Sequence, residues 1–284
     1  MSRHLAGVFV GSSAIAEGLI TPKQLRVRSY RRLVQGVYAD QSLEFDHRLR
    51  CAGVALLLPA GAAIGGHSAA AWHGAPFAQP RDPVTVIRPA EVPWKGPRGV
   101  RVHGTDLVDG DVEQHDHLPV TSALRTAWDV AALEPLGTAV AALDAMTRAE
   151  AVTTSQLQSM VARSAGRWGV VRVRRAVSMV DARAESAPES RVRVALVMGG
   201  LVPVPQFEVW LDGVFLGRVD LAFPEQGVAV EYEGAYHFEG TQMVRDDVRL
   251  ARLQAAGWRV VRLSAADLRD LDGALTKVRA ALAR

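Results

Sequence analysis

Cysteine is nearly absent from the sequence: Cys51 is the single thiol among 284 residues. One thiol excludes an internal disulfide framework and any metal site built from cysteines. This composition fits a reducing compartment, so we expect a cytoplasmic protein. Cys51 lies in the apolar stretch CAGVALLL, which predicts a small buried side chain rather than a reactive thiol.

Long uninterrupted hydrophobic runs are also absent. The segment 51–72 is mostly apolar over roughly the 20 residues that a membrane-spanning helix needs. Pro59, Gly61 and His67 interrupt it, so we expect a buried helix followed by a turn, and no membrane partner. The N-terminus, MSRHLAGVFVGSSAIAEG, has the charged start and apolar middle of a short signal peptide. It continues directly into helix and turn signals, which favours a folded segment.

Several motifs of known chemistry are missing or incomplete. The sequence has no internal repeat and no glycine-rich motif that would cradle a phosphate. The stretch GHS at 66–68 lacks the second glycine of a nucleophile elbow, which argues against a serine hydrolase. His115 and His117 form an H-x-H pair, but Pro119 predicts a loop and further ligands are missing, which argues against a metal site.

The remaining composition is that of a folded protein. Hydrophobic residues make up 49% and charged residues 22% of a chain that is long enough for two or three domains. The net charge is +3 and the isoelectric point is about 9.3. This balance allows a nucleic-acid partner without requiring one.

Residues 1–45 predict a winged helix that binds DNA. Residues 11–40 give the order helix, turn, helix and short hairpin, with Thr21-Pro22 typical of a helix start and Gly36 of a turn. Five positive charges and a tyrosine lie close together here: Lys23, Arg26, Arg28, Tyr30, Arg31 and Arg32. They would attract DNA phosphates, and the helix after the turn could enter a major groove. A solvated helix face is the alternative.

Residues 46–180 predict a mixed, mostly helical domain. The segment 47–58 predicts an apolar helix, the stretches PVTVI (83–87) and GVRVHG (99–104) predict strands, and helices dominate afterwards. Thr121, Thr138 and Thr154 stand where helix caps are expected. The polar segment 181–188 contains a proline at its end and predicts a linker.

Residues 187–284 predict a third domain, which makes the chain an α+β or α/β multidomain protein. Asp212-Gly213 is typical of a hairpin turn, and Thr241 of a helix start. The expected order is a helix at 188–199, strands at 205–211, 214–223 and 228–234, a helix at 241–256, a strand at 258–263 and a last helix from about 265.

Three acids converge on the predicted sheet of this domain. Glu231 and Glu233 point to the same face of the third strand because strand side chains alternate, and Asp220 on the second strand would face them. Crowded carboxylates repel each other unless a cation neutralises them, and Mg²⁺ prefers carboxylate oxygens together with water and phosphate. Solvated acids on an exposed strand are the alternative.

Residues 187–284 also resemble a nuclease family. The stretches VDLAFPE, VEYEGAYH, RDDVR and LQAAGWRVVRL, in this order, are similar to the very-short-patch-repair-like endonuclease domains of the PD-(D/E)xK superfamily. The resemblance implies a restriction-endonuclease-like αβββαβ core that hydrolyses DNA with Mg²⁺ or Mn²⁺. Asp220 and Glu231 would be the catalytic, metal-binding acids. Glu233 stands where the superfamily often has lysine, so it is a further ligand or base, or the mark of a weakened enzyme.

Four other residues gain a candidate role from this resemblance. His237 would be a general base or substrate contact, or a structural histidine. Asp246 and Arg249, three residues apart on a helix, would make a supporting contact and a phosphate contact, or only a surface pair. Glu189 would be a metal ligand on the first helix, or would cap that helix together with Ser186.

Residues 8–150 resemble a second family. ITPKQL, YRRLVQGVYAD, GGHSAAAWHG and LPVTSALRTAWDVA are similar to stretches of AbiEi-type antitoxins of type IV toxin–antitoxin systems. This resemblance implies DNA binding, often for autoregulation, with a cognate toxin or a second copy of the chain as a further partner. It implies no catalysis in this half.

Two functions of different classes follow. The first is a cytoplasmic, Mg²⁺-dependent DNA endonuclease or nickase whose winged helix delivers the nuclease domain to DNA. The second is an antitoxin-like, DNA-binding regulator whose nuclease-like domain is inactive, and Glu233 keeps this alternative open. RNA in place of DNA as the substrate also stays open.

Overall fold

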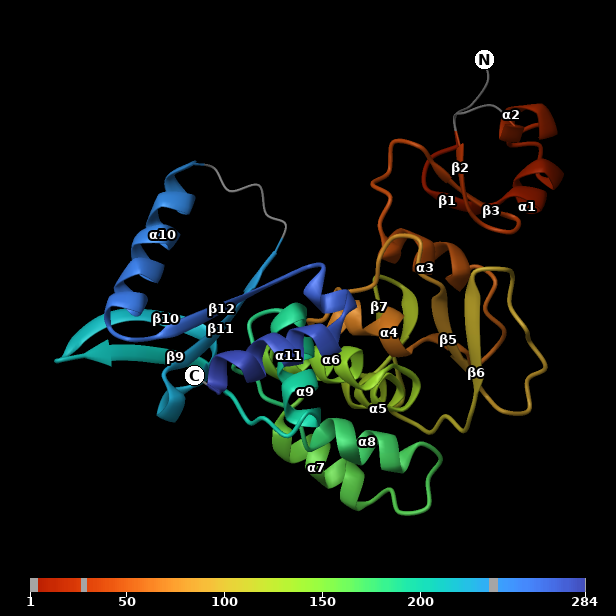
Figure 1. The fold of residues 1–284 in the computed structure, drawn as a ribbon. Coiled ribbons are helices and arrows are strands. Elements are labelled where there is room, and N and C mark those ends of the chain that lie inside the picture. The colour runs from red at the N-terminus through yellow and green to blue at the C-terminus, as the bar shows by residue number, and fades with distance from the viewer. Residues whose placement is uncertain (1–4, 27–29, 235–239, 284) are drawn as a thin grey trace. The chain divides into compact units, whose positions relative to one another are not determined.

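The structure is a computed structural model that describes residues 5–26, 30–234 and 240–283, with the backbone alone for 240–247. Its helices and three sheets give the α+β class that the sequence predicts (Figure 1). The chain forms two units: unit 1 contains Met1–Leu133 and Ala149–Ser164, and unit 2 contains Glu134–Arg148 and Ala165–Arg284. The division into domains at 1–45, 46–180 and 187–284 stays a prediction.

Unit 1 begins with a three-stranded antiparallel sheet in the order β1-β3-β2. Its elements are β1 (Val8–Val10), α1 (Gly11–Ala16), α2 (Pro22–Arg26), β2 (Tyr30–Val34) and β3 (Val37–Asp40). The expected order of helix, helix and hairpin is present, and the Thr21 hydroxyl accepts a hydrogen bond from the Gln24 N–H at 3.3 Å. Arg31 and Arg32 belong to β2, so they lie on a strand rather than on a helix.

A five-stranded mixed sheet follows in unit 1, in the order β6-β5-β4-β8-β7. Its region contains α3 (His47–Ala55), β4 (Ala63–Ile64), α4 (Gly66–Ala69), η1 (Ala70–His73), β5 (Val84–Arg88), β6 (Val100–Gly104), β7 (Val112–His115) and β8 (Leu118–Thr121). Cys51 of α3 is buried in the core beside these strands, as the sequence predicts. Burial raises the pKa of its thiol to about 12, so the thiol is unreactive at neutral pH.

The stretch HDHLP forms a hairpin, and the prediction of a loop there is wrong. β7 and β8 pair in antiparallel register around the two residues Asp116 and His117. Both of these have positive φ angles, 50° and 64°, which is the backbone of a tight hairpin turn. Pro119 lies inside β8 opposite Gln114. His115 therefore lies on a strand and has a fixed direction.

Four helices come next: α5 (Ala123–Leu133), α6 (Leu136–Arg148), α7 (Thr154–Ala162) and α8 (Val170–Val177). Thr153 caps α7 in a reciprocal capping box with Gln156, so the predicted cap at Thr154 is wrong by one residue. Thr121 ends β8, and Thr138 lies inside α6, so neither is a helix cap. Among the described residues, no helix is long and apolar enough to span a bilayer.

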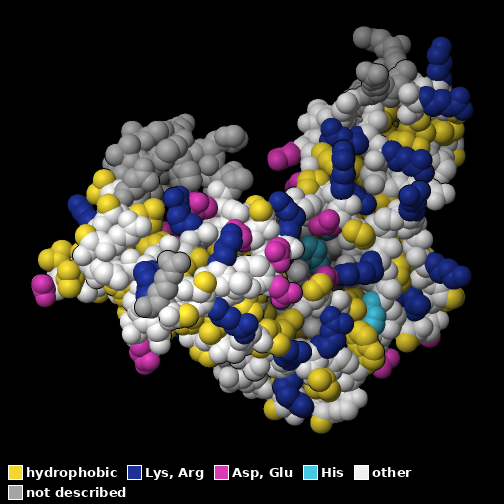
Figure 2. All heavy atoms as spheres, viewed as in Figure 1, with side chains coloured by type: hydrophobic (Ala, Val, Ile, Leu, Met, Phe, Trp, Pro, Cys, Tyr) yellow, Lys and Arg dark blue, Asp and Glu magenta, His cyan; other side chains and the backbone are white. Residues whose placement is uncertain are grey.

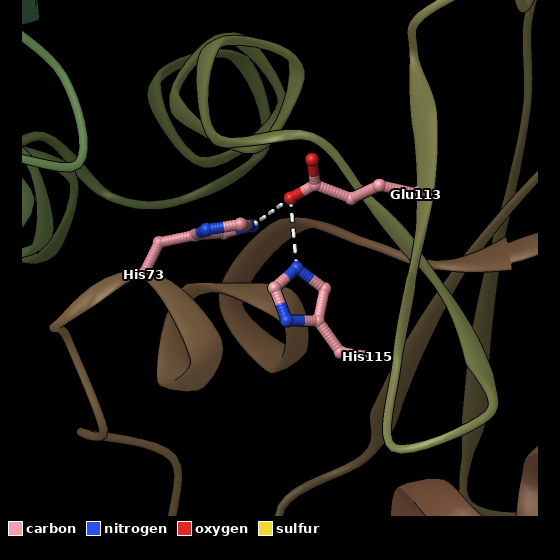
Figure 3. Close-up of side chains that lie close together, drawn as sticks. All are labelled: His73, Glu113 and His115. Carbon is pink, nitrogen blue, oxygen red and sulfur yellow. Dashed lines mark hydrogen bonds and ion pairs between the residues drawn. The ribbon is translucent and has the colours of Figure 1, made fainter.

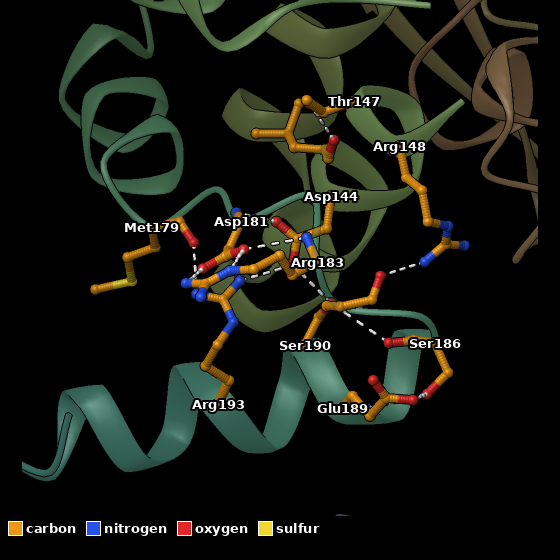
Figure 4. A network of polar contacts seen from close by, with 12 residues as sticks. Asp144, Thr147, Arg148, Met179, Asp181, Arg183, Ser186, Glu189, Ser190 and Arg193 are labelled. Carbon is orange, nitrogen blue, oxygen red and sulfur yellow. Dashed lines mark hydrogen bonds and ion pairs between the residues drawn. The ribbon is translucent and has the colours of Figure 1, made fainter. Parts of the chain in front are cut away.

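A buried polar network fixes the segment 181–188, which the sequence predicts to be a linker (Figure 4). The Asp144 carboxylate on α6 accepts hydrogen bonds from the Asp181 N–H at 2.7 Å, the Ser190 hydroxyl at 2.6 Å and the Arg193 guanidinium at 2.7 Å. Arg148 donates to the carbonyl of the buried Ala184. The polar residues of this segment and its surroundings therefore hold it to α6 and to the next helix.

Unit 2 ends in the order of elements that the sequence predicts. These elements are α9 (Ala187–Met198), β9 (Val204–Leu211), β10 (Val214–Phe223), η2 (Pro224–Gln226), β11 (Val228–Glu233), α10 (Gly240–Ala255), β12 (Arg259–Ser264), η3 (Asp267–Arg269) and α11 (Leu271–Leu282). The sheet has the order β12-β11-β10-β9. β12 runs parallel to β11, whereas the other neighbours are antiparallel.

Both faces of this sheet are covered. Val228 and Val230 belong to a buried cluster that includes residues of α9 and α11. Ala229, between them, belongs to a second cluster that includes Leu253 of α10. Since strand side chains alternate, Glu231 continues the face of Ala229 and points toward α10.

Candidate functional site

The pairing of β10 with β11 brings the predicted acids together. Leu221 pairs with Val230, which sets Asp220 opposite Glu231 in this antiparallel register. Alternation places Glu233 on the same face as Glu231. A pocket of about 130 Å³ opens between them; its lining residues are Arg218, Asp220, Glu231, Tyr232, Glu233, Arg249, Leu250 and Arg262.

Asp220 is the most perturbed acid of this site. One oxygen of its carboxylate accepts a hydrogen bond from the backbone N–H of Tyr232 at 2.9 Å, which fixes its orientation. Burial and the negative charges of Glu189 and Glu231 raise the pKa of Asp220 to about 7, although the Tyr232 N–H and Arg249 act in the opposite direction. The nearby positive charge is thus too small to keep this carboxylate fully ionised at neutral pH.

Glu231 is buried and pairs with Arg249 of α10. The guanidinium donates to both carboxylate oxygens, one of them at 3.0 Å, and also to the carbonyl of Arg218 at 3.2 Å. The side chain of Arg249 passes beside Gly217 of β10, where an added Cβ would meet its Cγ at 3.0 Å. The structure thus places Arg249, a predicted phosphate contact, against Glu231, one of the predicted metal ligands.

Glu233 lies at the exposed rim of the pocket. Its carboxylate forms an ion pair with Arg262 of β12, and the side chains of Glu233 and Arg262 are 39% and 50% exposed. Asp220 and Glu231 therefore lie deeper in the sheet than Glu233.

Glu189 on α9 caps its helix and also acts on Asp220. One of its oxygens accepts a hydrogen bond from the Ser186 hydroxyl at 2.7 Å. The other accepts from the Glu185 N–H at 3.0 Å and from the Gln206 side-chain amide at 2.9 Å. Its charge is the largest electrostatic cause of the raised Asp220 pKa. The capping and acidic-centre interpretations of Glu189 are therefore compatible.

Gln206 is a residue of this site that the sequence analysis misses. It lies on β9 with a φ of 51°, a left-handed conformation that a non-glycine residue adopts at a cost of about 1–3 kcal/mol. Its amide binds the Glu189 carboxylate. A glutamine within an alternating strand carries no sequence signal for such a conformation.

Three predicted residues cannot be placed in the site. His237 and Arg28 lie outside the described residues, and the side chain of Asp246 belongs to the part of α10 described by its backbone alone. Their candidate roles stay predictions.

Basic side chains gather over the N-terminal elements of unit 1 (Figure 2). Lys23 and Arg26 on α2 and Arg32 on β2 are exposed. Arg31 is partly engaged, because it donates to the Leu43 carbonyl at 3.3 Å and lies over the Phe45 ring.

Tyr30, the predicted stacking residue, has structural contacts. Its hydroxyl accepts a hydrogen bond from the Leu5 N–H at 2.9 Å, and its ring packs edge-on against Phe9. These contacts hold Tyr30 within unit 1, and its stacking role stays a prediction.

Comparison with known proteins assigns the chain to a family. No protein-family model matches it. Two proteins of Mycobacterium tuberculosis are each 32% identical to it over 251 residues, which cover 86% of this chain and 89% of the relative. They are "Uncharacterized protein MT2308" of strain CDC 1551 / Oshkosh and "Uncharacterized protein Rv2248" of strain ATCC 25618 / H37Rv. The chain belongs to the family of these proteins.

One solved structure is similar to part of the chain. It is the catalytic domain of the homing endonuclease I-Bth0305I, with 21% sequence identity and a TM-score of 0.27. The similarity covers 33% of this chain and 91% of that domain.

Proposed function

We propose that this protein is a metal-dependent nuclease that hydrolyses phosphodiester bonds of DNA at the Asp220–Glu231 pair. The observation that carries the proposal is the convergence of acids from separate elements. Asp220 and Glu231 meet through strand pairing, and the charge of Glu189 reaches Asp220 from α9. Arg249 pairs with Glu231, whereas the raised pKa of Asp220 indicates that the charge of this carboxylate is not fully compensated. A buried carboxylate of this kind is costly unless it is protonated or binds a cation.

The donor set fits a hard divalent cation such as Mg²⁺ or Mn²⁺. Asp220 and Glu231 would hold the ion directly, and Glu189 would add negative charge from α9. Such an ion supplies a polarised phosphate and a more acidic water when bound. The raised pKa of Asp220 supports this fit, since a carboxylate left partly protonated gains most from a neighbouring cation.

The chain's own residues would orient the reactants. The Tyr232 N–H holds Asp220 in one direction. Arg249 neutralises Glu231 and presents a planar guanidinium, whose geometry suits a phosphate as well as a carboxylate. The exposed basic residues of the N-terminal region would bind the DNA backbone without reading its sequence.

A plasmid-nicking assay tests the proposal. The full chain is incubated with supercoiled plasmid in the presence of Mg²⁺, Mn²⁺ or EDTA. Nicking is expected with Mg²⁺ or Mn²⁺ and not with EDTA. Asp220→Asn and Glu231→Gln should each slow nicking by at least about 100-fold, which corresponds to about 3 kcal/mol of lost transition-state stabilisation. DNA affinity, measured by fluorescence anisotropy in EDTA, should stay within about 2-fold, because the basic N-terminal region supplies separate contacts.

Glu225→Gln is the matched control. Glu225 is an exposed acid next to the end of β10, and its replacement by glutamine should leave the nicking rate unchanged. Thermal melting of each variant separates a loss of chemistry from a loss of folding. Full nicking by both site variants would show that the acids are not the active centre. The same assay with labelled RNA distinguishes the two nucleic acids as substrates.

The ion pairs of the site favour one second candidate function. Glu231 and Glu233 both pair with arginines, Arg249 and Arg262, which supply part of the charge that a metal would otherwise provide. A DNA-binding regulator with an inactive nuclease-like domain fits this arrangement, with a cognate toxin or a second copy as its partner. DNA binding without any nicking in either ion would favour the regulator.

A further inference from the structure

A second group of metal-binding side chains lies in unit 1, outside the acidic centre of unit 2. His73 is the last residue of η1, and Glu113 and His115 alternate on β7, so their side chains share one face of the strand. Figure 3 shows the three side chains pointing toward one another. One ligand atom of each lies within 4.8 Å of those of the other two.

A single carboxylate oxygen is the centre of this group. Oε1 of Glu113 lies 2.8 Å from Nε2 of His115 and 3.9 Å from Nε2 of His73 (Figure 3). The two imidazole rings stand edge to face, with their centroids 5.4 Å apart. Two imidazole nitrogens thus lie near one carboxylate oxygen, close enough together for a single ion to bind all three atoms.

The surrounding fold fixes this arrangement. The side chain of His73 is only 5% exposed, and its Nε2 is 2.8 Å from the carbonyl oxygen of Thr121 at the end of β8. The tight turn at Asp116 and His117 sets the direction of His115 on the neighbouring strand. His115 and Glu113 are 31% and 45% exposed, so an ion could reach the group from solvent.

We propose that His73, Glu113 and His115 bind one divalent transition-metal ion, with Zn²⁺ as the preferred ion. Imidazole and carboxylate are ordinary zinc ligands, and three such ligands leave a fourth position for water. Two imidazoles disfavour Mg²⁺, which prefers oxygen ligands, so this site and the acidic centre select different ions. Fe²⁺ accepts the same ligands but binds more weakly in the general affinity order of these metals.

Zinc binding would exchange one interaction of His73 for another. In the structure, its Nε2 faces the Thr121 carbonyl as a hydrogen-bond donor would. Coordination through Nε2 moves the ring proton to Nδ1 and releases that hydrogen bond. The metal would then connect η1 to the β7–β8 hairpin. Because the ion would bind the folded state and not the unfolded chain, it would stabilise unit 1.

The test uses the full chain, freed of metal with a chelator that is then removed. Isothermal titration with Zn²⁺ should show one site whose affinity falls by at least about 10-fold in His115→Asn and in Glu113→Gln. Co²⁺, the spectroscopic probe, should give the visible absorption of a low-symmetry four-coordinate ion in the original protein and not in these variants. Zn²⁺ should also raise the Tm of the original protein more than that of either variant.

Two controls make the result specific. His117→Asn is the same substitution as His115→Asn, two positions later at an exposed turn. This variant should bind Zn²⁺ as the original protein does. Asp220→Asn should also leave zinc binding intact, which separates this site from the proposed nuclease centre. Absence of a zinc site in the original protein overturns the proposal. Equal affinity in His115→Asn and Glu113→Gln, or an equal loss in His117→Asn, overturns it as well.

Discussion

Removal of the Asp144 carboxylate should be among the most destabilising single changes in unit 2. Its side chain is 1% exposed and accepts three hydrogen bonds, one of them from an arginine that is 8% exposed. Asp144→Ala leaves the Arg193 guanidinium buried without its carboxylate, a change that costs about 3–5 kcal/mol. Because Arg193 still donates to the Met179 carbonyl, we expect the lower half of this range.

A milder change separates charge from hydrogen bonding. Burial raises the pKa of Asp144, although Arg193, Ser190 and the Asp181 N–H act to lower it. Desolvation of the carboxylate therefore outweighs its favourable contacts, and the neutral amide of Asp144→Asn should cost only about 1–3 kcal/mol. The exposed pair of Arg218 and Glu185 is the control, and Glu185→Ala should cost less than about 1 kcal/mol.

Urea unfolding followed by circular dichroism and tryptophan fluorescence measures these differences, with the slope of the transition checked for each variant. The expected order of destabilisation is Asp144→Ala, then Asp144→Asn, then Glu185→Ala. If Asp144→Ala lowers the free energy of unfolding by no more than Glu185→Ala does, the network does not hold α6 to α9, and the account of segment 181–188 is wrong.

Three further outcomes are expected. Replacing the exposed basic residues Lys23, Arg26 and Arg32 together with alanine should weaken DNA binding. It should also reduce the slope of log affinity against log salt concentration by up to about 3, measured by fluorescence anisotropy. An unchanged slope would contradict this prediction. Hydrogen bonds from Lys277 and Ser264 lower the pKa of Asp267 to about 2, below its unfolded value. The stability that Asp267 contributes is then present above about pH 4 and lost as the pH falls through about 2. In the Asp267→Asn variant, the free energy of unfolding should therefore fall less steeply between these pH values. Gln206→Gly should melt at a higher temperature than Gln206→Ala by the equivalent of about 1 kcal/mol, since glycine accepts a positive φ, and equal melting temperatures would argue against strain there.

Local sequence signals predict the order of elements in the C-terminal region. Alternating side chains and the Asp212-Gly213 turn place β9 and β10 as neighbours, and the same alternation sets Glu231 and Glu233 on one face. Both signals act between residues that are close along the chain, so they need no knowledge of tertiary packing.

Contacts between distant segments could not be predicted in this way. The pairing of Arg249 with Glu231 depends on how α10 packs on the sheet. The approach of His73 to His115 depends on a five-stranded sheet that joins η1 to a hairpin about 40 residues later. The proline in HDHLP leads to the prediction of a loop. The sequence does not reveal that the two residues before Leu118, Asp116 and His117, have the positive φ angles of a tight hairpin turn.

Gly217 on β10 leaves room for the side chain of Arg249, which pairs with Glu231 on β11. A Cβ at position 217 would meet Cγ of Arg249 at 3.0 Å and Cδ at 3.2 Å, so the arginine side chain that reaches Glu231 would have to give by a few tenths of an ångström. Positions 217 and 249 should therefore vary together among related sequences, glycine accompanying arginine. A bulky residue at 217 should accompany a shorter residue at 249, and the Glu231 carboxylate would then have lost its built-in counterion.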